Sequence, residues 1–211
     1  MSLRCQPWLI PLKRRRPSAR LRRRQMAEPH EQYLRKAAGP RLIEARPHPG
    51  LRMIVVIPCH DEPDLTGALK RLANCEPPTG QAEVIVVINA SENNRPAVHH
   101  QNQRTLDQTA DWLAKRSDRW LPIHMLHLPD LPPRHAGVGQ ARKTGMDEAL
   151  RRLTDVGQAE DGLIVCYDAD CRCSANYFTG IESHFAAQPD APGCSIHFEH
   201  PLDANEWTAL G

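Results

Sequence analysis

Short apolar runs alternate along this chain with longer stretches in which apolar residues recur at helical spacing. Four runs predict strands, at 53–57 (MIVVI), 84–88 (VIVVI), 122–128 (PIHMLHL) and 163–167 (LIVCY). Helical spacing predicts helices over 63–73, 104–116, 138–153 and 175–187. A last run at 193–198 predicts a fifth strand.

This alternation predicts an α/β fold. The first two runs are apolar throughout, which is typical of strands buried on both faces. We therefore expect a mostly parallel sheet with helices on both faces. Ligands of such sheets bind at the carboxyl ends of the strands. The polar stretches that follow three of the strands, PCHDE, NASENN and DADC, should therefore meet at one edge.

The tripeptide DAD places Asp168 and Asp170 directly after the fourth predicted strand. In extended chain, residues two apart point to the same side, so the two carboxylates should lie close together and repel each other. A divalent cation relieves such repulsion, and Mg²⁺ favours one or two carboxylates together with substrate phosphates. The alternative is that both aspartates are solvated residues of a loop.

The stretch HAGVGQARKTG, residues 135–145, combines glycines with positive charge at a predicted helix start. Glycine allows close backbone approach, and a helix N-terminus attracts anions. Arg142 and Lys143 add charge suited to a diphosphate. The order of residues is neither a dinucleotide-binding fingerprint nor a P-loop. A glycine-containing loop with solvated charges is the alternative.

The positive charge of the chain lies at its beginning. The net charge is +2, but residues 1–25 hold nine Lys and Arg and no acidic residue. The other 18 basic residues face 25 acidic ones, so residues 26–211 carry −7. The tail could bind anionic lipid or nucleic acid. The alternatives are that the tail is disordered and functionless, or that it is not translated because Met26 is the natural start. We expect no nucleic-acid partner.

The remaining composition predicts a protein of the cytoplasm. No apolar run approaches the roughly 18 residues that span a bilayer, and the seven cysteines form no C-x-x-C pair. We expect these cysteines to be reduced, and their spacing matches no standard zinc site.

Four stretches, in this order, resemble the family 2 glycosyltransferases. VIPCHDE is similar to the end of that family's first strand, VVINASENN to the end of its second, GVGQARKTG to its G-x-x-x-A-R-N-x-G, and YDADC to its D-x-D. The match covers about residues 52–200. It implies a Rossmann-like GT-A fold and an inverting, Mg²⁺- or Mn²⁺-dependent transfer of sugar from a nucleoside-diphosphate sugar.

The resemblance also implies roles for individual residues. Pro58 and Glu62 would lie under the nucleoside, and Asn89 and Ser91 near the base. Arg142 and Lys143 would lie by the ribose and diphosphate. Asp168 would approach the ribose or the metal, and Asp170 would bind the metal.

Some positions depart from the family pattern. Ile88 and Asn89 replace two aspartates, which leaves the base preference open because an amide both donates and accepts. Lys143 replaces an asparagine, and His60 stands where an aromatic residue is common. We interpret His60 as a polar loop residue, with a general base as the alternative.

The family's acidic catalytic base lies well downstream of D-x-D, and we assign no catalytic residue here. Glu199 and His200, at the end of the fifth predicted strand, are candidates for this base, and the favoured alternative is that they are structural or substrate-edge residues. We expect residues 1–50 to be a basic, disordered extension and linker, and 51–211 to be a GT-A donor-binding domain truncated at its C-terminus.

The sequence is compatible with several acceptors and with more than one function. The acceptor could be a glycan, a lipid or a small molecule, and peripheral membrane association is possible. The alternative function is a catalytically incomplete nucleotide-sugar-binding fragment or scaffold. A nucleotidyltransferase is disfavoured, because PCHDEPD is not a glycine-rich loop.

Overall fold

The structure is a computed structural model that describes residues 28–197. Its elements follow in the order α1 (Pro29–Lys36), β1 (Leu51–Cys59), α2 (Leu65–Ala73), β2 (Gln81–Ser91), α3 (Pro96–Lys115), β3 (Ile123–Leu131), the 3-10 turn η1 (Pro133–His135), α4 (Val138–Asp155), β4 (Leu163–Cys166) and α5 (Tyr177–Ala187). The basic tail, Glu199 and His200 lie outside the described residues.

The four strands form one parallel sheet in the order β3-β2-β1-β4. The chain builds outward from β1 through β2 to β3 and then returns to place β4 on the other side of β1. This is a Rossmann-like arrangement, and the strand order reverses between β1 and β4. The α/β class expected from the sequence is confirmed.

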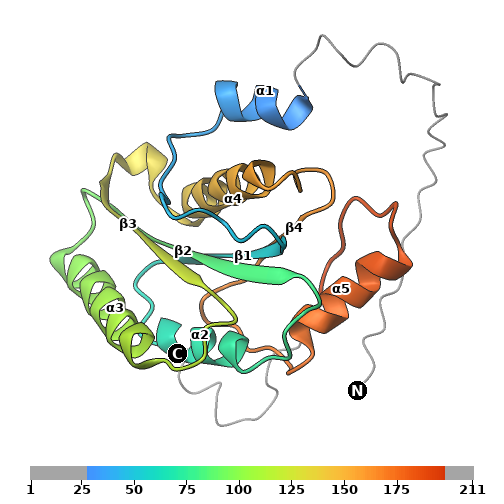
Figure 1. The fold of residues 1–211 in the computed structure, drawn as a ribbon. Coiled ribbons are helices and arrows are strands. Elements are labelled where there is room, and N and C mark those ends of the chain that lie inside the picture. The colour runs from blue at the N-terminus through green and yellow to red at the C-terminus, as the bar shows by residue number, and fades with distance from the viewer. Residues whose placement is uncertain (1–27, 198–211) are drawn as a thin grey trace.

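Helices cover both faces of the sheet (Figure 1). On β1, Val55 and Ile57 face a core shared with α2, α3 and α5, whereas Ile54 and Val56 face α4. All four side chains are fully buried. Residues 53–57 of β1 and 84–88 of β2 are apolar at every position because each face of the sheet packs against helices. Gly145 lets α4 approach β1 closely, since a Cβ there would clash with Val56 Cγ1 and lie 3.3 Å from Val87 Cγ2.

Two expectations about secondary structure need correction. Residues 193–197 form no strand, and Phe198 lies outside the described residues. Ile196 packs against the core, but the backbone of this segment joins no ladder, and an apolar pattern alone does not make a strand. Helix α3 begins at Pro96 rather than at 104. Its buried face carries Asn102, Thr105 and Thr109, so an apolar pattern does not reveal it.

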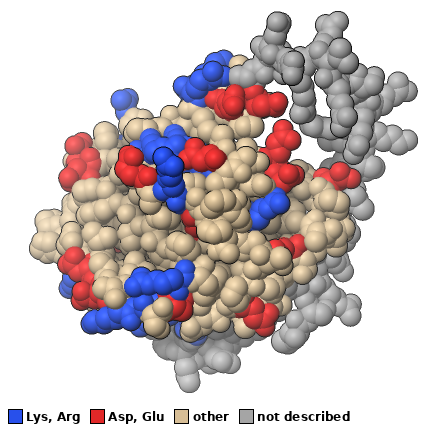
Figure 2. Space-filling view, viewed as in Figure 1, with Lys and Arg blue, Asp and Glu red and all other residues tan. Residues whose placement is uncertain are grey.

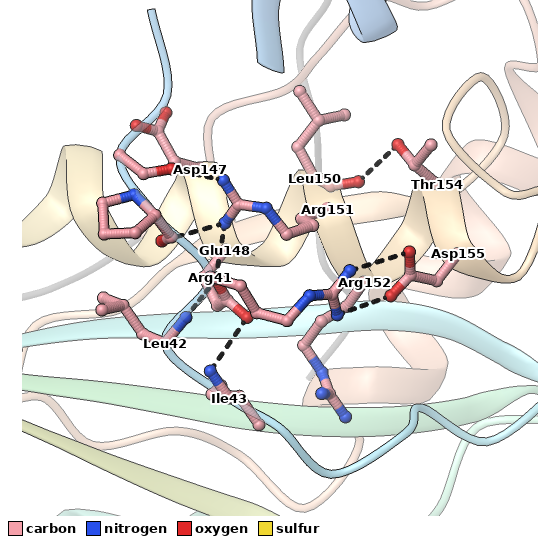
Figure 3. A network of polar contacts seen from close by, with 12 residues as sticks. Arg41, Leu42, Ile43, Asp147, Glu148, Leu150, Arg151, Arg152, Thr154 and Asp155 are labelled. Atoms are coloured by element: carbon pink, nitrogen blue, oxygen red, sulfur yellow. Dashed lines mark hydrogen bonds and ion pairs between the residues drawn. The ribbon is translucent and has the colours of Figure 1, made fainter. Parts of the chain in front are cut away.

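Packed structure begins before residue 51, where we expected an extension and linker. Helix α1 and the segment after it lie along the outer side of α4 (Figure 1). The buried carboxylate of Glu148 accepts the N–H groups of Leu42 and Ile43, each at 3.2 Å. Arg151 donates to the carbonyl of Gly39 at 2.6 Å, and Arg41 pairs with Asp155 (Figure 3). These polar contacts are not visible in a pattern of apolar residues.

A buried ion pair joins α4 to β2. Arg152 is 1% exposed, and its Nε donates to Glu83 Oε2 at 2.7 Å. Glu83 is 3% exposed and also lies 3.4 Å from His124 Nε2. Arg152 further donates to the carbonyl of Ala45 at 2.7 Å. Each charge is therefore compensated within the protein, as burial requires.

No helix in the described part of the chain is long and apolar enough to cross a membrane. The cytoplasmic location and any peripheral membrane association stay predictions. Figure 2 shows acidic and basic side chains interspersed on the face that it presents, without a continuous basic surface.

Candidate functional site at the switch point of the sheet

A cavity of about 470 Å³ opens at the carboxyl ends of β1, β2 and β4. It lies where the strand order reverses, which is the general position of ligand sites in open parallel sheets. Its lining consists of Pro58, Cys59, His60, Glu62, Asn89, Val138, Arg142, Asp168, Ala169 and Asp170. The polar stretches that follow three separate strands therefore meet, as the sequence predicts.

The loop after β1 is held in place by helix α3. Asp61 adopts a positive φ of 53°, and its N–H donates to Asn102 Oδ1 at 2.9 Å. Thr105 Oγ1 donates to the carbonyl of Glu62 at 2.7 Å. Asn102 also donates from Nδ2 to the carbonyl of Asn89 at 3.3 Å, so one buried amide joins the ends of β1 and β2. Sequence reasoning missed Asn102, because nothing in its helix distinguishes a buried amide from an exposed one.

Asn89 joins the end of β2 to the start of α4. Its side chain is fully buried, and Nδ2 donates to the carbonyl of Gly137 at 3.0 Å. Asn89 Oδ1 has no partner within the described residues. The carbonyl of Asn89 lies 2.8 Å from His60 Nδ1. Because a carbonyl only accepts, that imidazole nitrogen must carry the proton.

Helix α4 begins at the rim of the cavity. Gly137, the residue before it, has φ of +108°, a conformation that side chains disfavour. Val138 follows, is 57% exposed and lines the cavity. The N–H groups of a first helical turn have no acceptor inside the helix. This end of α4 therefore offers donors and a positive dipole end to an anion in the cavity.

The charged residues of the cavity are one arginine and two aspartates together with Glu62. Arg142 Nη2 lies 2.7 Å from Asp168 Oδ1, and the side chains are 35% and 56% exposed. Arg142 Nε is buried and has no partner among the described residues. The buried Ala169 separates Asp168 from Asp170, and both aspartates are exposed and line the cavity. Both therefore face the cavity, but residues 169–170 form a turn, in which the N–H of Cys171 donates to the carbonyl of Asp168 at 3.0 Å, and not the extended chain that we expected.

Two residues that the resemblance assigned to the ligand are not in the cavity lining. Lys143 Nζ lies 2.6 Å from Asp147 Oδ2 and donates to the carbonyl of Ala37 at 3.1 Å. The hydrogen bond to Asp147 raises the pKa of Lys143, so the amino group remains charged where it lies. Ser91 Oγ accepts the N–H of Asn93 at 3.2 Å. Neither side chain lines the cavity, and their expected contacts with the ligand stay predictions.

The carboxylates fit a hard divalent cation in part. Asp168 and Asp170 supply oxygen ligands of the kind that Mg²⁺ and Mn²⁺ prefer. Asp170 makes no hydrogen bond or ion pair within residues 28–197, so its carboxylate is available. No group of three or more His, Cys, Asp or Glu side chains in that range could hold a metal ion. A cation at this site would need water and oxygen atoms of a bound molecule to complete its coordination shell.

Fold and site together define a parallel α/β protein with a polar, mixed-charge cavity at the switch point of a Rossmann-like sheet. No known family model matches the chain, and no curated protein matches it. Among solved structures, the chain is similar to a mannosyltransferase, PcManGT from Pyrobaculum calidifontis, in complex with GDP-Man and Mn2+. The sequence identity is 17% and the TM-score is 0.38, a likeness too slight to support a functional argument. The match covers 74% of this chain and 38% of that enzyme.

Proposed function

We propose that this chain is the donor-binding part of a metal-dependent glycosyltransferase, resembling family 2 with a GT-A fold. It would bind a nucleoside-diphosphate sugar, from which the sugar is transferred with inversion to an acceptor. The observation that supports this most strongly is the meeting of distant motifs in one cavity. Pro58, Asn89, Arg142 and Asp170 belong to four separate stretches of sequence, and all four line it.

Each part of a nucleoside-diphosphate sugar has a suitable partner in the lining. Arg142 and the first turn of α4 offer positive charge and N–H donors to the diphosphate. Arg142 Nε is buried and has no partner among the described residues, so a shift of this side chain toward a phosphate oxygen would satisfy it. The nucleoside would lie over Pro58 and beside Glu62, with the base near Asn89.

Asp168 and Asp170 would hold the divalent cation. When bound, the cation would neutralise the charge that builds on the leaving diphosphate. Arg142 contributes in the same direction and keeps Asp168 oriented through their 2.7 Å ion pair. The two aspartates are compatible with a shared space because Arg142 and the cation compensate their charge.

The lining provides no residue that we assign as the catalytic base. The protonated Nδ1 of His60 donates to the carbonyl of Asn89, which orients the ring and supports its interpretation as a loop residue of the site. The acceptor would be a glycan, a lipid or a small molecule.

The proposed function is tested by measuring release of nucleoside diphosphate from a panel of UDP, GDP and CDP sugars, with Mn²⁺ and with chelator. We expect metal-dependent release from one class of nucleotide sugar. Binding of one nucleotide without any release, at all acceptors tried, would support the binding-fragment alternative. Neither binding nor release, from a folded protein, would refute the proposal.

A further inference from the structure

Two cysteines lie in contact, and one of them belongs to the loop that carries the site aspartates. Cys75 follows helix α2, and Cys173 lies between β4 and α5. Their Sγ atoms are 3.7 Å apart, although the residues are 98 positions apart in the sequence. Cys75 is 5% exposed, and Cys173 is a partly exposed residue of the pair.

The backbone holds the two cysteines together independently of their thiols. The N–H of Glu76 donates to the carbonyl of Ala175 at 2.8 Å, which fixes the end of α2 against the segment before α5. Cys75 Sγ also lies 3.5 Å from the carbonyl of Ser174. A disulfide requires the two sulfurs to approach by about 1.7 Å, which side-chain rotation can supply where the backbones are already adjacent.

We propose that Cys75 and Cys173 form a redox-modification site that a peroxide closes into a reversible disulfide. The inference depends on the contact between the two thiols and not on the proposed function. The bond would tie the segment that follows Asp168 and Asp170 to α2, which follows β1 in the chain.

The reaction balances with hydrogen peroxide as the oxidant. The Cys173 thiolate attacks one peroxide oxygen, the O–O bond breaks, and the leaving hydroxide takes a proton to become water. The resulting sulfenic acid is then attacked by the sulfur of Cys75, which loses its proton as the S–S bond forms and a second water leaves. Two thiols are oxidised by two electrons, and one peroxide is reduced to two waters.

The environment of the pair favours Cys173 as the attacking sulfur. The hydrogen bond with Cys75 lowers the pKa of Cys173 to about 7, with help from Tyr167 and the charge of Arg71, against the opposing effect of burial. The same hydrogen bond and burial raise the pKa of Cys75. Burial raises the pKa of Cys59 to about 12. A thiolate is the nucleophile in such reactions, so Cys173 should react before these other thiols.

The test oxidises the reduced, full-length folded chain with a small excess of hydrogen peroxide and maps its peptides without reduction. We expect one cross-linked peptide that joins Cys75 to Cys173 and disappears after treatment with dithiothreitol. The melting temperature should rise by roughly 5–15 °C, because the bond closes a long loop.

Three variants complete the test. Cys75→Ser and Cys173→Ser should each abolish the cross-link and the thermal shift, whereas Cys166→Ser, a change at an exposed thiol, should retain both. Peptide mapping of the wild-type chain decides the matter even if a variant fails to fold. A cross-link between other cysteines, or oxidation of Cys173 to the sulfinic acid with Cys75 still reduced, would overturn the proposal.

Discussion

Replacing Glu83 with Gln is expected to lower the free energy of unfolding by about 3–5 kcal/mol. The substitution preserves the size of the side chain but leaves the guanidinium of Arg152, which is 1% exposed, without a compensating charge. A buried charge without a partner is costly because the low-dielectric interior does not solvate it. Urea denaturation followed by circular dichroism measures the change.

An exposed ion pair of the same helix serves as the matched control. Asp155→Asn removes the charge that pairs with Arg41, and the side chains of Arg41 and Asp155 are 37% and 34% exposed. This substitution should lower the free energy of unfolding by less than about 1 kcal/mol. The double replacement Glu83→Leu with Arg152→Leu should recover much of the loss, because it leaves no buried charge. Equal losses for Glu83→Gln and Asp155→Asn would contradict this account of the core.

The same pair gives the wild-type protein an acid-sensitive component of stability. Burial alone would raise the pKa of Glu83, but its hydrogen bonds with His124 and Arg152 outweigh this effect and hold the pKa below its ordinary value of 4.5. A carboxyl whose pKa is lowered in the folded state stabilises the fold at pH values above the pKa that the same carboxyl has in the unfolded chain. The contribution is therefore complete above about pH 4.5 and fades as the pH falls through the lowered pKa.

Replacing Arg142 with Met is expected to weaken binding of a nucleoside diphosphate by roughly 10–100-fold. Arg142 is the one Lys or Arg side chain of the described residues that lines the cavity, and its buried Nε lacks a partner. The change keeps most of the side-chain volume and removes a charge-assisted hydrogen bond. Isothermal titration calorimetry with the nucleotide that the protein prefers measures the loss.

Two further variants separate the effect of Arg142 from that of charge in general. Arg104→Met removes an exposed charge from α3 and should leave the affinity unchanged. Lys143→Met should lower the affinity by less than about threefold, because the Lys143 amino group contacts Asp147 and the carbonyl of Ala37. A loss for Lys143→Met as large as that for Arg142→Met would contradict the arrangement described here.

The sequence predicted the sheet and the place of the site because both follow from local patterns. Runs such as MIVVI have few alternatives to a buried strand, and the carboxyl ends of parallel strands must share one edge. Asp168 and Asp170 both line the cavity, although a turn at residues 169–170 brings them there and not the extended chain that their spacing suggested. These predictions needed no knowledge of which helix packs where.

The features that sequence reasoning missed depend on contacts between distant residues. Glu148 holds the backbone before β1, and Asn102 holds the loop after it, yet each looks like an ordinary polar residue of a helix. Lys143 follows Arg142 directly, but adjacent residues of a helix point about 100° apart, so only one of them reaches the cavity. The prediction of a fifth strand at 193–198 was wrong for residues 193–197, because a strand needs a neighbouring strand to pair with and an apolar pattern does not specify one.

The most direct test of the proposed site is a thermal-shift titration with UDP, GDP and CDP, each with and without Mn²⁺, on the wild-type chain and on Asp170→Asn. Asp170 is exposed and makes no hydrogen bond within the described residues, so its replacement should not weaken the fold. We predict that one nucleotide raises the melting temperature of the wild type only when Mn²⁺ is present, and that Asp170→Asn loses this shift. The absence of a shift with every nucleotide, or a shift that is equal in Asp170→Asn and independent of metal, would contradict the account.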